Sequence, residues 1–415
     1  MTFPGKSSMN FNPEFPMQKL EQQFTVQYTF PVFFVRDIFR AEKQVLASVL
    51  AQGGDKRHKV LCVIDSGVLA HKSSLCRRIE HFAADHSALM QLCGILTISG
   101  GEGCKTKPSV IDSIVRHIHA HHLCRQSFIL VIGGGAVLDA AGYAAAIAHR
   151  GLRLIRMPTT VLAQNDAGVG VKNGINTLGR KNFLGTFAPP FAVINDFTFL
   201  DSLPPRELRA GMAEAVKVAL IKDNSFFNTL YNQRHHLAAF DREPLEQLIY
   251  QCAALHMHHI GTQGDPFEFG SARPLDFGHW SAHKLEEMTG GMLHHGEAVA
   301  IGMALDALYS SRAGIISEKE VERIFTILTD LGLPLYHPTL ADLDVPGALH
   351  EFQEHLGGEL AITLLTGIGG KKEVDRIDTD LMKRCIHELA DRFKGINAVV
   401  DDEPTGIAPL YGVLN

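Results

Sequence analysis

Short apolar runs that end in glycine-rich or polar turns recur through the first half of this 415-residue chain. The runs lie at 24–35, 59–68, 95–103, 127–133 and 152–160. Between them, residues 108–120 carry apolar side chains at helical spacing, and an Ala-rich helical segment follows the glycines at 133–135. Strands that alternate with helices form a parallel sheet covered on both faces. The alternation therefore predicts a Rossmann-like α/β domain.

The pattern changes after about residue 195, where helical periodicity dominates. The predicted helices lie at 205–222, 244–260, 279–289, 296–313 and 317–332. A strand-like stretch at 359–369 is the exception. We therefore predict an α/β plus α chain, divided into a loose N-terminal arm (1–24), an α/β domain (25–195), a mainly helical domain (196–395) and a C-terminal tail (396–415).

The composition excludes several classes of protein. Apolar residues make up 46% of the chain, which favours sizeable cores over disorder. Lys and Arg number 39 against 45 Asp and Glu, so the net charge of −6 indicates neither a nucleic acid nor a membrane surface as partner. The seven cysteines include no Cys-x-x-Cys pair, and the N-terminal segment lacks the apolar core of a signal peptide. We expect a cytoplasmic protein that acts on a small molecule.

Three polar or glycine-rich turns follow predicted strands. They contain Gly133–Gly135, Gly100-Gly101-Glu102 and Pro158-Thr159-Thr160. Ligands of open parallel sheets bind beyond the carboxyl ends of the strands, and a helix N-terminus there suits a pyrophosphate. The turns thus predict a dinucleotide site, although the glycine triplet alone is equally consistent with a tight structural turn. Asp65, at another strand end, can either bind ribose hydroxyls or form the turn before Ser66.

Histidine is frequent, at 22 residues, so most of these side chains carry no special role. His279 and His283 lie one helical turn apart on a shared face, and His295 precedes another predicted helix. With a carboxylate, such a set can bind zinc, or it can consist of ordinary helix histidines.

The helix at 206–223 offers that carboxylate. Glu214 and Lys217 are neighbours on one face, and the residues around them are mostly apolar. They form either a surface ion pair or a buried pair that binds a ligand or takes part in chemistry.

Taken together, these motifs resemble the sugar phosphate cyclases, the superfamily typified by 3-dehydroquinate synthase. The resemblance rests on GGGAVLDAAGYAAAIAHRG, PTT, VGVKNGIN, RKNFLGTFAPP, LPPRELRAGMAEAVK, DFGHWSAHKLE and HHGEAVAIG, in this order between residues 60 and 370. Within the superfamily, GDPFEFGSARPLDFGHWSAHKLE resembles the 2-epi-5-epi-valiolone synthases, which cyclise sedoheptulose 7-phosphate.

The resemblance implies a set of cofactors and site residues. It implies NAD in the α/β domain, zinc (or cobalt) and substrate in the helical domain, and a homodimer. The implied metal ligands are Glu214, His279 and His295. The implied NAD residues are Asp65, Glu102, Lys105, Gly134, Gly135, Asp139, Thr159, Thr160, Asp166 and Lys181. The implied active-site residues are Lys172, Asn182, Lys217, Arg273, Asp276, His283 and His355.

Three departures from the dehydroquinate synthase pattern bear on the substrate. That enzyme carries Asn where this chain has Asp276, a Lys upstream of the arginine matching Arg273, and another Lys where this chain offers His355. Residues 250–265 contain neither Lys nor Arg. Because those lysines help to hold a substrate carboxylate, their loss favours a substrate without one, such as a heptulose phosphate.

The resemblance implies a carbon–oxygen lyase reaction in which NAD is reduced and reoxidised within each turnover. An alcohol is oxidised, phosphate leaves by β-elimination, the ketone is reduced again, and an intramolecular aldol step closes the ring. Other products of the superfamily remain open, namely 2-epi-valiolone, desmethyl-4-deoxygadusol, deoxy-scyllo-inosose and 3-dehydroquinate. So do an NAD- and metal-dependent alcohol dehydrogenase and a non-catalytic nucleotide sensor on the same fold.

Overall fold

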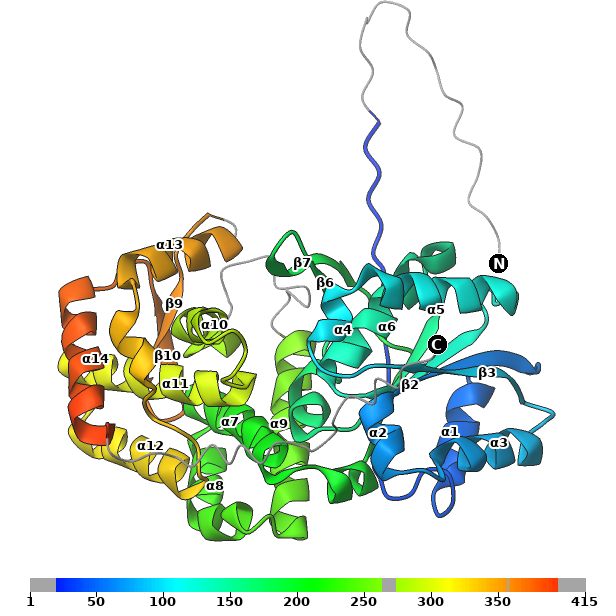
Figure 1. Ribbon diagram of the computed structural model, residues 1–415, viewed down its shortest axis with the longest axis horizontal. Helices are drawn as coiled ribbons and strands as arrows, with labels where there is room; N and C mark the ends of the chain where they lie inside the picture. The colour runs from blue at the N-terminus through cyan, green and yellow to red at the C-terminus, as the bar shows by residue number, and fades with distance from the viewer. Residues whose placement is uncertain (1–19, 263–273, 357, 395–415) are drawn as a thin grey trace, which may run out of the picture.

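The computed structural model describes residues 20–262, 274–356 and 358–394. A six-stranded parallel sheet forms the core of the N-terminal half (Figure 1). Its strands are β1 (Val32–Val35), β2 (His58–Asp65), β3 (Met90–Ile98), β4 (Phe128–Gly133), β5 (Arg153–Pro158) and β8 (Ala192–Asp196), in the order β1-β8-β5-β4-β2-β3. The chain leaves β2 toward β3 and returns on the other side at β4. The strand order therefore reverses at the β2–β4 pair, where ligands of such sheets bind.

Helices cover both faces of this sheet because its central strands are apolar on both sides. All six residues of β4 are buried, as are six of the eight in β2. One face packs against α1 (Lys43–Ala51), α2 (Ser66–His71) and α3 (Leu75–Asp85). The other packs against α4 (Gly103–Thr106), α5 (Pro108–Ala120) and α6 (Gly135–Ile147).

A two-stranded hairpin interrupts the path from β5 to β8. It follows the π-helical turn η2 (Ala163–Ala167) and consists of β6 (Lys172–Thr177) and β7 (Arg180–Phe187). Leu178 and Gly179 form the turn with φ of 53° and 74°, the left-handed conformations of a tight hairpin turn. Figure 1 shows the hairpin between α6 and α10. Two distant parts of the sequence thus meet at this hairpin.

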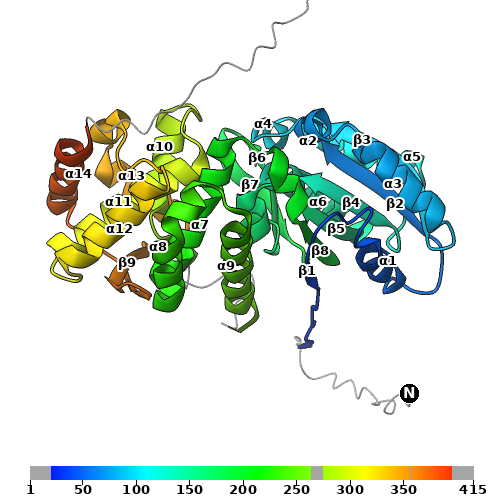
Figure 2. The same ribbon diagram turned by 90° about the horizontal axis from the view of Figure 1, so that it is seen from below.

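The C-terminal half is a helical bundle built around α11 (Figure 2). Its helices are α7 (Pro205–Lys222), α8 (Asn224–Ala238), α9 (Arg242–Thr262), α10 (His279–Met288), α11 (His295–Arg312), α12 (Glu318–Asp330), α13 (Val345–His355) and α14 (Thr379–Phe393). The antiparallel strands β9 (Ile362–Gly367) and β10 (Gly370–Val374) pack beside them. Fifteen residues of α11, from Gly296 to Ser310, are buried, as expected for a helix surrounded by others.

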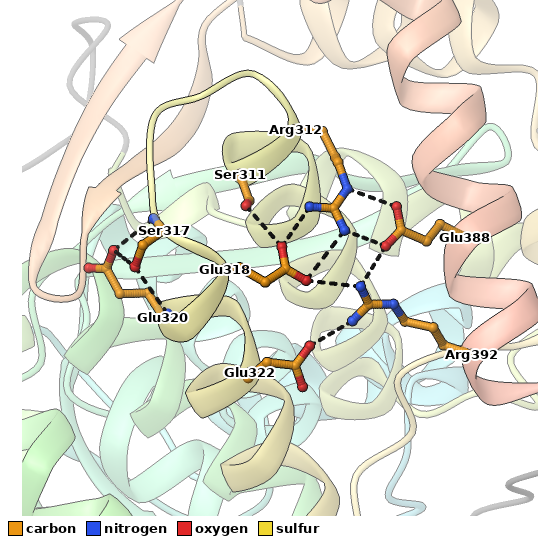
Figure 3. Close-up of polar contacts among 8 residues, drawn as sticks. All are labelled: Ser311, Arg312, Ser317, Glu318, Glu320, Glu322, Glu388 and Arg392. Carbon is orange, nitrogen blue, oxygen red and sulfur yellow. Dashed lines mark hydrogen bonds and ion pairs between the residues drawn. The ribbon is translucent and has the colours of Figure 1, made fainter.

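Ion pairs at the bundle surface connect α14 to α11 and α12 (Figure 3). Arg312 lies 2.6 Å from Glu318 and 2.5 Å from Glu388. Arg392 lies 2.9 Å from Glu318 and 2.7 Å from Glu322. Two arginines and three carboxylates thus tie the last described helix to the body of the bundle.

Several elements of the structure differ from those predicted from the sequence. Only Val32–Val35 of the predicted strand at 24–35 pairs with the sheet. Ser66 and Gly67 begin helix α2, where the sequence predicted a glycine turn. The predicted strand at 359–369 is shortened to β9 and has a partner, β10, that the sequence did not indicate. The predicted tail lies wholly outside the described residues, and the predicted arm mostly so. No helix within the described ranges is long and apolar enough to cross a membrane.

Candidate functional site

Three of the predicted strand-end turns meet at the carboxyl edge of the sheet. Asp65 ends β2 beside the glycines that follow β3 and end β4. A Cβ at Gly100 would lie 2.4 Å from the Asp65 carboxylate, and a Cβ at Gly133 would lie 3.3 Å from the Asp65 Cβ. Asp65 also caps α2 by accepting the Gly67 N–H at 2.8 Å. Both predicted roles of Asp65 are thus compatible with its position.

The N-terminus of α6 lies at this edge behind two glycines. Gly134 has φ −72° and ψ 176°, so its backbone conformation is open to any residue. A Cβ at Gly135 would meet only Ala167, at an ordinary 3.5 Å. Neither strain nor crowding within the protein explains the glycine at 135, and a glycine at this helix N-terminus fits the close approach of an anion. Thr160 lies beside Gly134, where its methyl would be 3.3 Å from an added Cβ.

A connected polar group extends from α4 and α6 to the hairpin. The buried Lys105 ammonium lies 2.7 Å from Asp139 on α6 and donates to Asn182 Oδ1 at 2.5 Å. Burial alone would lower the pKa of Lys105, but Asp139 and Glu102 raise it, so the group is cationic at neutral pH. Glu102 accepts a 2.7 Å hydrogen bond from Asn176 of β6. Asn182, predicted among the active-site residues, thus contacts the predicted NAD residues.

A second polar group is buried where η2 meets α7 and α9. Glu214 and Lys217 are 2% exposed each, and their side chains are 2.6 Å apart. Burial would raise the pKa of Asp166, but the contact with His256 at 2.8 Å and the charges of Lys217 and Lys172 hold it well below its usual range. Because both side chains are buried, Glu214 and Lys217 do not form a surface ion pair, and that alternative is wrong.

The local sequence determines how two of the predicted metal ligands are presented. Gly278, with φ 77°, turns the chain into α10 so that His279 is its first residue. His294 caps α11 in a capping box with Glu297, so His295 is the first residue of that helix. The ring centroids of His279 and His295 are 5.3 Å apart.

Hydrogen bonds fix which ring nitrogen each histidine offers. His279 Nδ1 lies 3.1 Å from the Phe277 carbonyl, which can only accept, so Nε2 is unprotonated in the neutral ring. Burial, together with nearby Lys217, keeps the pKa of His279 well below its usual value. His295 Nδ1 lies 3.3 Å from Glu286, so this contact occupies Nδ1 and not Nε2. Both rings are thus held in the way that metal-binding histidines usually are.

Glu286 joins the predicted metal site to the predicted nucleotide site. Its second carboxylate oxygen lies 3.0 Å from Lys181 of the hairpin strand β7. Burial opposes ionisation of Glu286, but the contacts with His295 and Lys181 prevail and lower its pKa to about 2. The carboxylate is therefore charged, and it contacts a residue from each half of the molecule, His295 in the bundle and Lys181 in the hairpin.

The predicted donors are of the chemical kinds that a divalent metal takes. Within the described ranges, no three His, Cys, Asp or Glu side chains converge closely enough to hold an ion. Glu214 Oε1 is buried without a well-aligned hydrogen bond and faces Lys217. A carboxylate together with two imidazoles matches the ligand chemistry of zinc.

The remaining predicted residues vary in how far they can be placed. Lys172 begins β6 with an exposed side chain. Asp276 lies in η4 (Pro274–Asp276), near enough for its charge to raise the pKa of Lys217. His283 is half-buried, with its ring 5.5 Å from that of His279. His355 ends α13, and Arg273 lies outside the described residues.

Comparison with known proteins identifies the family. The 3-dehydroquinate synthase N-terminal family matches residues 95–210, and the 3-dehydroquinate synthase C-terminal family matches residues 211–354. A 2-epi-5-epi-valiolone synthase of an Actinoplanes species is 35% identical over 83% of this chain and 86% of its own length. This chain is a sugar phosphate cyclase of the 3-dehydroquinate synthase family.

Two further relatives show the range of this cyclase family. A 3-dehydroquinate synthase of a Sulfurovum species is 34% identical over 71% of this chain and 83% of its own length. The structure of ValA, a 2-epi-5-epi-valiolone synthase of Streptomyces hygroscopicus with NAD+ and Zn2+ bound, has a TM-score of 0.80. It is 28% identical, and the match covers 90% of this chain and all of that one. The predicted fold and family are thus confirmed.

Two residues that contact the candidate site were not predicted from the sequence. Glu286 lies two turns after His279 on the same face of α10 as His283, a spacing that could have revealed it. His256 was one of three histidines on a predicted helix, and only its contact with Asp166 distinguishes it. No local signal marked that long-range contact.

Proposed function

We propose that this cyclase converts sedoheptulose 7-phosphate to 2-epi-5-epi-valiolone and releases phosphate. The reaction combines oxidation and re-reduction of one carbinol with β-elimination of phosphate, ring opening and an intramolecular aldol closure. NAD is regenerated in each turnover, so no second nicotinamide substrate is consumed. We assign NAD binding to residues 25–195, and metal and substrate binding to residues 196–395.

The proposed cofactors have residues suited to them. NAD would lie across the strand ends, with its pyrophosphate at Gly134 and Gly135. Zinc would be held by Glu214, His279 and His295, as the donor set allows. When bound, NAD supplies reversible hydride transfer and zinc supplies a Lewis acid for a sugar oxygen.

The chain's own residues would provide charge and proton transfer. Burial opposes the charge on Lys217, but Glu214 and Asp166 raise its pKa, so it remains a cation that can stabilise an enolate oxygen. His283 lies one turn from His279 and can carry a proton between a sugar hydroxyl and water. Lys172, with Arg273, would hold the phosphate before it leaves. Asn182 and His355 complete the proposed set.

The substrate assignment rests mainly on the position of the Asp276 carboxylate near Lys217. Its charge acts on Lys217, at a position where the dehydroquinate synthase pattern has a neutral Asn. A carboxylate here accepts hydrogen bonds from sugar hydroxyls and repels an acidic substrate. The segment 250–262 contains no Lys or Arg, and its imidazoles His256 and His259 contact Asp166 and Lys222. Both features disfavour a substrate carboxylate.

The direct test is incubation of the purified protein with sedoheptulose 7-phosphate, NAD and zinc, with identification of the product by mass spectrometry and NMR. We expect 2-epi-5-epi-valiolone and one phosphate per cyclitol. Faster formation of dehydroquinate from the seven-carbon acid would contradict the assignment, and a different cyclitol would correct the product. Net NADH formation from simple alcohols would instead indicate a dehydrogenase.

A variant pair sharpens this test. Asp276→Asn should lower kcat/KM for the heptulose phosphate about tenfold to 100-fold, because a charged hydroxyl acceptor is lost. The acid substrate should remain poor, since the missing cations are not restored. Asp375→Asn, at an exposed position on the bundle, is the matched control.

A further inference from the structure

In the described part of the chain, one arginine is fully buried, and its hydrogen-bond acceptors are neutral oxygens. Arg156 lies on β5 with 0% exposure. Its Nη1 donates to the carbonyls of Gly168 at 3.1 Å and Gly170 at 2.7 Å. Its Nη2 donates to the Lys172 carbonyl at 3.1 Å and to Asn173 Oδ1 at 2.7 Å. A buried charge is retained only where hydrogen bonds compensate for lost hydration. Here a single loop provides them for both Nη atoms, whereas Nε is buried without an acceptor.

That loop, residues 166–173, carries two residues of the proposed site at its ends. Asp166 lies in the last turn of η2 beside His256 and Lys217, and Lys172 opens the hairpin strand β6. Four carbonyls of the loop, those of Ala167, Gly168, Gly170 and Lys172, accept hydrogen bonds from the guanidinium. Because each bonded carbonyl holds its peptide plane in place, it restricts the positions of the Cα atoms on either side. The Lys172 Cα lies in one of these peptide planes, and the Asp166 carbonyl accepts the N–H groups of Val169 and Gly170 in the same loop. The guanidinium thus restrains the backbone from which both functional side chains start.

The loop's close packing supports this role independently. Gly142 lies within α6, where glycine is unfavourable for a helix. A Cβ at this position would lie 1.8 Å from Asn173 Oδ1, the atom that accepts from Arg156. At Gly168, a Cβ would lie 2.3 Å from the Ala163 carbonyl oxygen. Both glycines leave the room that this arrangement of the loop needs.

We propose that Arg156 is the positioning residue of the 166–173 loop and that, through Asp166 and Lys172, it sets the affinity for NAD and for the substrate phosphate. The inference rests on the function proposed above for its kinetic consequences. The ordering of the loop itself does not depend on that function. A planar guanidinium with several donors is needed, because one ammonium cannot reach acceptors spread along the loop.

The test is Arg156→Ala, with Arg153→Ala as the matched control. Arg153 lies on the same strand but donates to Gly53 and Gln126, away from the loop. In the ligand-free protein, amides of 168–173 should exchange about tenfold or more faster in Arg156→Ala than in the control. The KM for sedoheptulose 7-phosphate and the Kd for NAD should rise about tenfold to 100-fold, because a loop shift of about 1 Å suffices for such losses.

Chemical rescue separates positioning from a merely structural role. Guanidinium chloride at tens of millimolar should restore KM severalfold in Arg156→Ala, whereas urea of the same concentration should not. A folded Arg156→Ala protein with wild-type exchange and wild-type KM would overturn the proposal, as would an equal rise in KM for Arg153→Ala. If the wild-type protein makes no cyclitol, the proposed function fails while amide exchange still tests the loop.

Two milder variants keep the test decisive if Arg156→Ala does not fold. Arg156→Lys keeps the charge but not the fork of donors, and Gly142→Ala keeps Arg156 but displaces Asn173. Both should raise the Kd for NAD and accelerate amide exchange in the loop. Wild-type values for both variants would refute the role of Arg156.

Discussion

A buried carboxylate beneath the candidate metal site allows a quantitative prediction. Asp306, on α11, is 0% exposed. Its Oδ1 accepts the Trp280 indole N–H at 2.9 Å, and its Oδ2 accepts the Gly278 N–H at 3.1 Å. These two donors flank His279, so Asp306 fixes the turn from which that histidine is presented.

Replacing Asp306 by Ala leaves two buried donors without partners. Each unpaired donor costs about 1–3 kcal/mol, so the bundle should lose about 2–6 kcal/mol of unfolding free energy. Asp306→Asn keeps one acceptor oxygen but turns an amide N–H toward the other donor. We therefore expect about half of the loss in that variant.

The chain supplies its own probe, because Trp280 is its single tryptophan and is buried. Urea unfolding followed by Trp280 emission reports on the helical bundle. With a urea dependence of about 1–3 kcal/mol per molar, the midpoint for Asp306→Ala should fall by about 0.7 M or more. Asp375→Ala, at an exposed position, should leave it unchanged. A midpoint for Asp306→Ala equal to that of wild type would refute the reasoning.

Three further predictions concern packing, charge and metal binding. Gly302→Ala would place a Cβ 1.9 Å from the Gly278 carbonyl oxygen, so calorimetry should show destabilisation of about 1–3 kcal/mol. Gly103→Ala is the control, because a Cβ there meets nothing within 4 Å and should leave the stability unchanged. Hydrogen bonds from its arginine partners lower the pKa of Glu318 from 4.5 to about 2, so its stabilising effect is present above pH 4.5 and lost as the pH falls toward 2. Wild-type protein should therefore lose more thermal stability than Glu318→Gln over that range, and parallel melting curves would contradict this. Glu286→Gln should weaken zinc binding by metal-free protein about tenfold to 100-fold in chelator competition; unchanged affinity would exclude an orienting role.

Local sequence signals predicted the strongly periodic elements well. The predicted helices at 108–120 and 205–222 match α5 and α7 at both ends. Both begin at a proline in the first turn, and their apolar residues recur at helical spacing. The β6–β7 hairpin was missed because β7 is almost wholly exposed and lacks a clear alternation. Its position comes from packing against α6, which no local pattern records.

For the site, the sequence alone determined which chemical groups are available and which share a helix face. His279 and His283 lie on one turn, and Glu214 and Lys217 are neighbours, because helix geometry fixes such spacings. The family resemblance then gave the cofactors and the reaction class.

Only the tertiary structure decided which groups from distant elements meet. Asp166 meets His256 at 2.8 Å, and Lys181 meets Glu286 at 3.0 Å across the two halves of the chain. It also placed the Arg156 guanidinium against a loop beyond its own strand. Hydrogen bonds act over about 3 Å, so these contacts depend on how whole helices and strands pack together. That packing is a property of the folded chain as a whole, and no short stretch of sequence contains it.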